Sequence, residues 1–281
     1  MLLRLAYSPD ADDAFMFRAA IEGLVDTEGL RFDPVTSDTQ SLNNIAFSGD
    51  VDVTAISVAA WPLLAEKYLL LPHGGSVGRG YGPVVVAKKE YALDELSGLR
   101  LATPGVGTTA HLVTRLIAPN VEMKRIPITP YEAIFEAIES HEVDAGIIIH
   151  EGRLTYEHHR LVKIVDIGAW WAEQTRLPLP LGANVIRREL GSEIIQKASR
   201  VLQCSIRWGL DHRDEMIRFL IDHIHRPEEV ATFELIDRYL DMYANEETYS
   251  YSDDTCKGMQ LLLDRGYEAG LIENKVDVEF A

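Results

Sequence analysis

Apolar and polar positions along the chain follow two spacings, one typical of buried strands and one typical of amphipathic helices. Three segments share one order: an apolar strand, a short loop of small or hydroxyl residues, and an amphipathic helix. They begin with LLRLAYS (2–8), VDVTAIS (51–57) and LRLATPGVGTT (99–109). A fourth apolar run, VDAGIIIH, ends at His150. Strands that alternate with helices in this way predict a parallel α/β fold.

Two further apolar segments, PVVVAK (83–88) and ANVIRR (183–188), bracket the middle of the chain and are predicted to be crossover strands. We therefore expect two lobes, the first from residues 1–87 and 185–281 and the second from an inserted segment, residues 88–184. Beyond Gly191 the apolar residues follow i, i+3, i+4 spacing, so the C-terminal region is predicted to be helical. This organisation is that of a type II periplasmic binding protein, whose ligand lies in the cleft between the lobes. A single Rossmann-like sheet is the alternative, but the glycine-rich loops lack GxGxxG and the Walker pattern of nucleotide sites.

Composition is that of an ordinary globular protein, with 47% hydrophobic and 25% charged residues. The net charge of −17 argues against nucleic acid or an anionic membrane as a partner, because both require extended basic surface. It does not exclude a small anion, which backbone N–H groups at helix starts can bind. The sequence leaves open whether the protein is a monomer or a homodimer.

The two cysteines, Cys204 and Cys256, form no CxxC motif and predict neither a disulfide framework nor a metal cluster. The opening MLLRLAYSPDADD has too short an apolar stretch for a signal peptide, and no segment reaches membrane-spanning length. We expect a cytoplasmic protein.

His150 is the first candidate for a catalytic residue. Ligands of open α/β sheets bind beyond the carboxyl ends of the strands, where this imidazole is expected. A histidine titrates near neutral pH and can remove a proton beside a carbonyl as a general base. Glu151 and Arg153 follow it as possible orienting partners. The alternative is a buried histidine whose ring bonds a backbone carbonyl.

Hydroxyl residues stand at two predicted strand-to-helix turns. Ser57 ends one strand, and Thr108 with Thr109 follows Gly105 and Gly107 at the start of a helix. A helix start with hydroxyls and flexible backbone suits a carboxylate or another oxyanion. Simple helix capping is the alternative for each residue by itself.

Three aspartates, Asp10, Asp12 and Asp13, lie between the first strand and its helix. Such a group can serve as a metal or acid–base cluster, but aspartates at this position routinely cap helices, and we favour capping. The histidine pairs 158/159 and 223/225 lack the spacing that places ligands on one helical face, so we expect them on the surface. We therefore predict no metal site.

Two more segments supply candidate ligand contacts. Trp170 and Trp171 precede a proline-rich stretch, and we expect one indole, assigned to Trp170, to line a flat pocket while the other packs in the core. Arg79 lies in the glycine-rich loop 73–83 and can reach an anion. The same loop is equally suited to be a hinge or lid.

With these motifs the chain resembles the 1,4-dihydroxy-6-naphthoate synthase family of the futalosine route to menaquinone, a group related to chorismate dehydratase. The resemblance covers nearly the whole chain. Its motifs are Ser8-Pro9 with Asp13 and Phe15, AIS (55–57), GGSVGRGYGPVVVA (74–87), PGVGTTA (104–110), GIIIHEGRLTY (146–156) and GAWWAEQTRLPLPLG (168–182).

The resemblance implies a carbon–carbon lyase that converts cyclic dehypoxanthinyl futalosine to 1,4-dihydroxy-6-naphthoate and dihydroxyacetone without a cofactor. His150 matches the general base of the family. The matching substrate contacts are Ala55, Ile56, Ser57, Thr108 and Thr109, and we expect Ser8 of the first motif to contact the substrate as well. Where the family reads SPCPND, this chain reads SPDADD, which adds two carboxylates, Asp10 and Asp12, near a cleft for an anionic substrate. The alternatives are chorismate dehydratase and a non-catalytic solute-binding protein for a small carboxylate.

Overall fold

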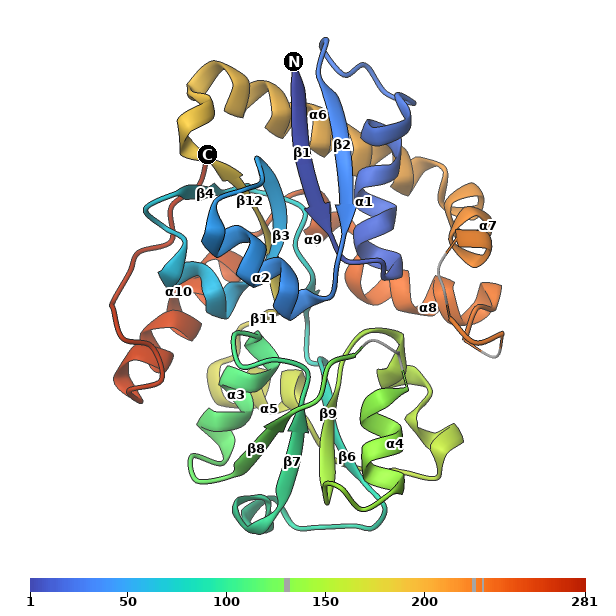
Figure 1. Ribbon diagram of the computed structural model, residues 1–281, viewed down its shortest axis with the longest axis vertical. Coiled ribbons are helices and arrows are strands. Elements are labelled where there is room, and N and C mark those ends of the chain that lie inside the picture. The colour runs from blue at the N-terminus through green and yellow to red at the C-terminus, as the bar shows by residue number, and fades with distance from the viewer. Residues whose placement is uncertain (129–131, 224–225, 229) are drawn as a thin grey trace.

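The computed structural model describes residues 1–128, 132–223, 226–228 and 230–281. Two lobes are stacked along the long axis, and each contains a five-stranded sheet (Figure 1). Both chain termini lie in the first lobe, and the second lobe is formed by the middle of the chain.

The sheet of the first lobe has the strand order β2-β1-β3-β12-β4. Its strands are β1 (Leu2–Tyr7), β2 (Arg31–Thr36), β3 (Val53–Ser57), β4 (Tyr68–Leu70) and β12 (Gly182–Arg187). β1 is parallel to β2 and β3, whereas β12 runs antiparallel to β3 and β4. Every residue of β3 is buried, as expected for a strand covered on both faces.

Three helices cover that sheet: α1 (Ala11–Glu22), α2 (Thr39–Ser48) and α6 (Ser192–Asp211). Apolar residues of α1 and α6 pack against Leu3 and Leu5 on one face. Leu42 of α2 packs against Ala6 and Ala55 on the other.

The sheet of the second lobe has the order β10-β6-β9-β7-β8. Its strands are β6 (Val84–Ala87), β7 (Arg100–Thr103), β8 (Glu122–Arg125), β9 (Ala145–Ile148) and β10 (Val162–Asp166). α4 (Ala133–Glu139) packs on one face, and α3 (Thr109–Ile117) with α5 (Ile167–Thr175) packs on the other. β9 and β7 are parallel, so their carboxyl ends share one edge of the sheet.

A two-stranded ribbon of β5 (Val77–Gly78) and β11 (Leu179–Pro180) links the lobes. We expected the first boundary at residue 87, but β6 pairs with β9 and β10, so its residues belong to the second sheet. We expected the return at residue 185, but β12 already pairs with β3 from Gly182. Both differences arise because hydrophobicity identifies a strand but not the sheet that it joins.

The C-terminal region is helical, as predicted. It contains α7 (Arg213–His223), α8 (Phe233–Tyr243), α9 (Glu246–Tyr249) and α10 (Asp253–Glu268). Short 3-10 helices are η1 (Val58–Leu63), η2 (Leu93–Gly98), η3 (His150–Leu154), η4 (Tyr156–His159) and η5 (Arg188–Leu190). The helix expected after Ser57 is the 3-10 helix η1, which contains Pro62 and so cannot continue as a regular α-helix. Within the described ranges, no helix has the length and apolar character needed to cross a bilayer.

Candidate active site

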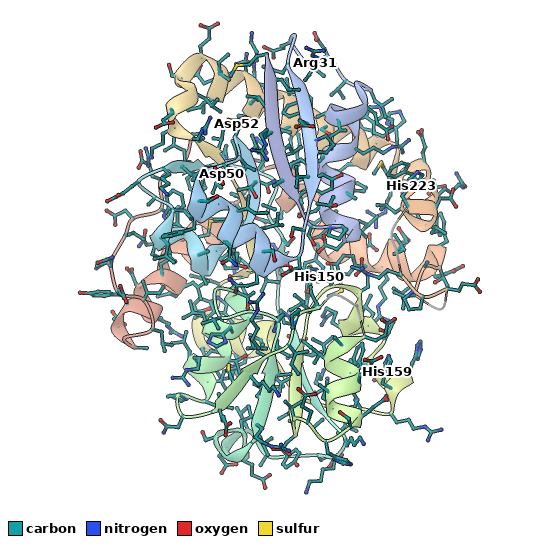
Figure 2. The ribbon with its side chains drawn as sticks, in the orientation of Figure 1. Arg31, Asp50, Asp52, His150, His159 and His223 are labelled. Carbon is teal, nitrogen blue, oxygen red and sulfur yellow. The ribbon has the colours of Figure 1, made fainter. Side chains whose placement is uncertain are left out.

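His150 lies between the two lobes, at the carboxyl end of β9 (Figure 2). It begins η3 with a φ of 53°, a left-handed conformation that is uncommon outside glycine and often found at functional sites. Its side chain is 14% exposed. His159 and His223 lie at the periphery of the molecule, away from it. His225, expected on the surface, lies outside the described residues.

A cavity that includes His150 in its wall is lined by residues of both lobes. The volume of this cavity is about 100 Å³. Predicted contacts on its wall are Ser8, Ala55, Ile56 and Ser57 from the first lobe and Thr108, Thr109 and His150 from the second. The fold therefore brings together most of the residues selected from the sequence.

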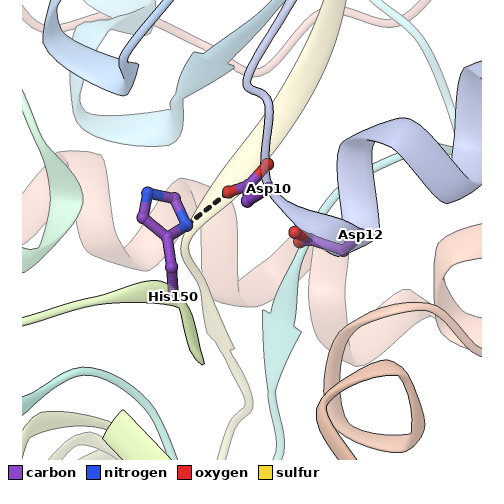
Figure 3. A group of neighbouring side chains, drawn as sticks. All are labelled: Asp10, Asp12 and His150. Atoms are coloured by element: carbon purple, nitrogen blue, oxygen red, sulfur yellow. Dashed lines mark ion pairs between the residues drawn. The ribbon is translucent and has the colours of Figure 1, made fainter. Parts of the chain in front are cut away.

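The ring of His150 has a partner on each nitrogen. Nδ1 forms an ion pair with Asp10 of the first lobe (Figure 3). Nε2 lies 3.3 Å from the hydroxyl of Thr39. Burial by itself disfavours the charged imidazole, but the carboxylates of Asp10, Glu151 and Asp12 together raise the pKa of His150. Burial likewise opposes ionisation of Asp10, yet the adjacent His150 holds the pKa of Asp10 below its ordinary value.

The aspartates do not cap α1 as we expected. Asp10 occupies the N-cap position, but its side chain accepts no backbone hydrogen bond from the helix. Asp12 instead bonds the hydroxyls of Ser76 and Tyr239, and Asp13 accepts the backbone N–H of Ser8 at 2.7 Å. The capping prediction failed because these carboxylates find partners that are distant in sequence or that precede the helix.

Two of these carboxyls are buried beside other negative charges. Burial and the charge of Asp10 raise the pKa of Asp12 to about 7. Burial, with Asp10 and Asp12, raises the pKa of Asp13 well above its ordinary value. The cavity therefore holds one carboxyl whose pKa is lowered, Asp10, and two whose pKa values are raised, Asp12 and Asp13, an arrangement typical of sites for proton transfer.

Another part of the cavity wall carries hydroxyls and a helix start. Thr108 caps α3 by accepting the N–H of His111 at 3.2 Å, and Thr109 donates to the carbonyl of Leu181 at 2.7 Å. The first N–H groups of a helix have no partner within it, so this end of the cavity suits an anionic group.

Ser57 does not cap η1, so the capping alternative does not hold for this residue. Asn43 of α2 accepts the N–H of Ser57 at 2.9 Å and donates to its hydroxyl at 3.3 Å. The same amide donates to the carbonyl of Gly107 at 3.2 Å. Asn43 thus joins the Ser57 turn of the first lobe to the loop before α3 of the second.

The comparison with known sequences decides the family. A sequence profile described as "Menaquinone biosynthesis" matches residues 3–268. The chain belongs to this family. A relative from Thermus thermophilus named 1,4-dihydroxy-6-naphtoate synthase is 37% identical over 243 residues, which cover 86% of this chain and 87% of the relative. A relative of the same name from Streptomyces coelicolor is 32% identical over 273 residues, which cover 96% and 94%.

Solved structures agree with the fold. The crystal structure of protein AF1704 from Archaeoglobus fulgidus is 40% identical with a TM-score of 0.89, covering 96% of this chain and 98% of that chain. The alkanesulfonate-binding protein SsuA from Xanthomonas axonopodis pv. citri, bound to MOPS, is 15% identical with a TM-score of 0.72, covering 99% and 96%. At that identity the second likeness shows the fold alone, and it confirms the predicted periplasmic-binding-protein architecture of this menaquinone-biosynthesis family member.

Two expected ligand contacts are not on the cavity wall of this family member. Arg79 forms an ion pair with Glu247 and donates to Ser252 at 2.9 Å, with its side chain 49% exposed. Trp170 is partly buried against the hydrophobic core, and Trp171 is fully buried, its indole N–H donating to Pro178 at 3.0 Å. Both residues have structural partners, and neither lines the cavity.

Other cavity residues were not selected from the sequence. Asn184 of β12 lines the cavity and is 2% exposed, and its side-chain oxygen accepts no hydrogen bond within the part of the chain that the structure describes. Tyr239 of α8 and Ser76 also line it. Asn184 ends no motif and lies in an apolar strand, so only its polar side chain in a buried strand could have identified it.

Asp10, Asp12 and His150 form a cluster of residue types that can bind a cation. Among the described residues, one ligand atom from each lies within 4.8 Å of the others. Carboxylate oxygen and imidazole nitrogen suit several divalent metals. However, Nδ1 of His150 is engaged by Asp10, and both oxygens of Asp12 bond hydroxyls. Within the described residues, the buried Oδ1 of Asp10 accepts no hydrogen bond and is the one oxygen of these two aspartates without a partner.

Proposed function

We propose that this chain is a 1,4-dihydroxy-6-naphthoate synthase, a carbon–carbon lyase of menaquinone biosynthesis that cleaves cyclic dehypoxanthinyl futalosine and releases dihydroxyacetone. Membership of the menaquinone-biosynthesis family and two relatives with this name support the proposal. The observation that carries it is a single imidazole on the wall of the cavity between the lobes, with an ionised carboxylate at its Nδ1.

His150 is the proposed general base. Its Nε2 removes a proton from the carbon next to the substrate ketone, and the electron pair passes to the carbonyl oxygen. In the retro-aldol-type cleavage that follows, a hydroxyl of the three-carbon unit loses its proton and becomes the ketone of dihydroxyacetone. The electron pair of the broken carbon–carbon bond passes to a ring carbonyl, which takes up a proton and becomes an aromatic hydroxyl. Formation of an aromatic ring makes the overall step favourable. This route uses no oxidant, reductant or cofactor.

The hydroxyl wall is the proposed binding site for the substrate carboxylate. The hydroxyls of Thr108 and Thr109 donate to the carbonyls of Gly105 and Leu181, so the donors available at this wall are the backbone N–H groups at the start of α3. Ser57 lies on the facing lobe. A helix N-terminus stabilises negative charge by its unpaired N–H groups and by its dipole. The acidic residues at the start of α1 line the same cavity, and repulsion from Asp10 favours binding of the carboxylate away from them.

Product analysis tests the reaction. The purified protein is incubated separately with cyclic dehypoxanthinyl futalosine and with chorismate, and the products are identified by mass spectrometry. We expect 1,4-dihydroxy-6-naphthoate from the first and no change in the second. Dehydration of chorismate, or thermal stabilisation by either compound without turnover, would contradict the proposal.

Substitution of the base tests its role. His150→Ala should lower kcat by on the order of 10²–10⁴-fold, the usual contribution of a positioned base. Binding, measured by thermal shift with the substrate, should persist. A variant that retains wild-type turnover would remove His150 from the mechanism.

A further inference from the structure

Asp10 and His150 come from different lobes and meet across the cavity. Asp10 is the N-cap residue of α1, with an extended backbone (φ −79°, ψ 168°), and its side chain is directed away from the helix toward the imidazole (Figure 3). The side chains of Asp10 and His150 are 4% and 14% exposed. An ion pair so shielded from water is screened little by salt.

We propose that Asp10 is a positioning residue that holds His150 in the tautomer with its proton on Nδ1, which leaves Nε2 as the basic atom in the cavity. This inference rests on the proposed function of His150 as the base. A neutral imidazole has one donor and one acceptor nitrogen, and the partner of the donor decides which is which. A carboxylate can only accept, so it selects the proton on Nδ1.

The other side of the ring is consistent with this tautomer. Thr39 Oγ1 lies 3.3 Å from Nε2, and a hydroxyl can donate to an unprotonated nitrogen. The contact is long for a hydrogen bond that involves a hydroxyl, so a substrate C–H can replace it at small cost. Nδ1 is covered by Asp10, so Nε2 is the nitrogen available to the substrate.

Asp10 also stabilises a positive charge on the ring of His150. When Nε2 takes a proton, the imidazolium faces the carboxylate of Asp10, as in serine-protease triads, where an aspartate orients and stabilises the histidine. The other charged groups near the pair are Asp12 and Glu151, which favour the cation, and Arg226, which acts on Asp10. Of these, Asp10 alone contacts the ring at Nδ1.

Nuclear magnetic resonance of the wild-type protein labelled with ¹⁵N-histidine provides a test that needs no substrate. The chain has nine histidines, and His150→Gln identifies the signal of His150 by its loss. We expect the neutral ring to carry its proton on Nδ1. A neutral ring protonated on Nε2 would overturn the inference, whatever reaction the protein catalyses.

The variant Asp10→Asn tests the same point in catalysis. Its amide can donate to Nδ1 and select the wrong tautomer, so kcat should fall by on the order of 10²–10⁴-fold while KM changes within about threefold. The acidic limb of the kcat/KM profile should move to lower pH, because the charge that stabilises the imidazolium is lost. Unchanged kcat with an unmoved limb would overturn the inference.

Asp12→Asn is the matched control, since Asp12 is equally buried but does not contact the ring. It should leave the proton of the neutral His150 on Nδ1, and a change of tautomer in this variant would contradict the assignment to Asp10. If Asp10→Asn does not fold, the tautomer of His150 measured in the wild-type protein tests the inference by itself. If the wild type makes no 1,4-dihydroxy-6-naphthoate, the proposed function fails, and the tautomer still tests the pair.

Discussion

The side-chain oxygen of Gln40 in the first lobe accepts the backbone N–H of Gly107 in the second lobe at 2.7 Å. With the Asn43 contact to the same residue, this bond closes one side of the cavity, while Asp10 and His150 meet on another. The structure therefore has the two lobes in contact beside the site.

Gly105→Ala should hinder this closure. A Cβ at position 105 would lie 2.6 Å from the Cβ of Gln40, a distance that requires the backbones to separate. We expect KM to rise by on the order of tenfold, since part of the binding energy is lost on opening the lobes. X-ray scattering of the substrate-saturated variant should give a larger radius of gyration than the wild type.

Gly98→Ala is the control for that substitution. A Cβ at Gly98 would meet no atom within 4 Å, so this variant adds a methyl group to the same lobe without a contact. Its KM should equal that of the wild type. Equal KM values for Gly105→Ala and Gly98→Ala would show that closure at Gln40 is not needed for binding.

The wild-type rate should depend on pH through His150. The base must be neutral, and its neighbours raise the pKa of His150 above 6.5 despite burial. kcat/KM should therefore increase with pH, with the midpoint of the acidic limb above 6.5. A midpoint below 6.5, measured with a substrate that does not titrate in this range, would be inconsistent with the ion pair with Asp10.

Thr108→Val should affect both binding and stability. The variant loses the cap of α3, which is worth about 1 kcal/mol, and the bond from the hydroxyl to the carbonyl of Gly105, which together hold the helix start at the proposed carboxylate site. We expect a higher KM and a lower midpoint of thermal unfolding. Thr108→Ser retains the hydroxyl and should restore both. A Ser variant as impaired as Val would assign the effect to packing of the methyl group instead.

Asp12→Asn should change how stability depends on pH. Folding raises the pKa of Asp12 from 3.8 to about 7, so between these values the folded state holds a proton that the unfolded chain has released. The contribution of Asp12 to the free energy of unfolding is therefore fully present below pH 3.8 and is lost as the pH rises through about 7. The variant should lose less unfolding free energy between pH 5 and pH 8 than the wild type, measured by urea denaturation. Asp33→Asn, at an exposed position of β2, should behave like the wild type.

The sequence predicted the elements well because strands and helices depend on local spacing. The start of α3 at Thr108 and Thr109 and the end of β9 before His150 are both read from neighbouring residues. The role of Asp10 could not be read in this way. An aspartate before a helix predicts a cap, and the partner that competes for it lies 140 positions away in the other lobe.

The prediction for Arg79 was wrong for the same reason, because its partner is distant in sequence. Its glycine-rich surroundings suggested an anion site, but its charge is paired with Glu247, which is 168 residues further along the chain. Conversely, Asn184 lies in a strand whose pattern predicts only core packing, and the cavity beside it depends on how two lobes meet. Contacts within an element follow from local sequence, whereas contacts across the cleft require the tertiary structure.

The insertion of the second lobe between β4 and β12 has a consequence for biosynthesis of the chain. The first sheet cannot be completed until β12 has left the ribosome, because β12 lies between β3 and β4. The second sheet is contiguous in sequence, from β6 to β10, and is available for folding earlier. During translation the inserted lobe can therefore become structured while β3 and β4 still lack their neighbour β12, a period in which their exposed edges are most open to aggregation.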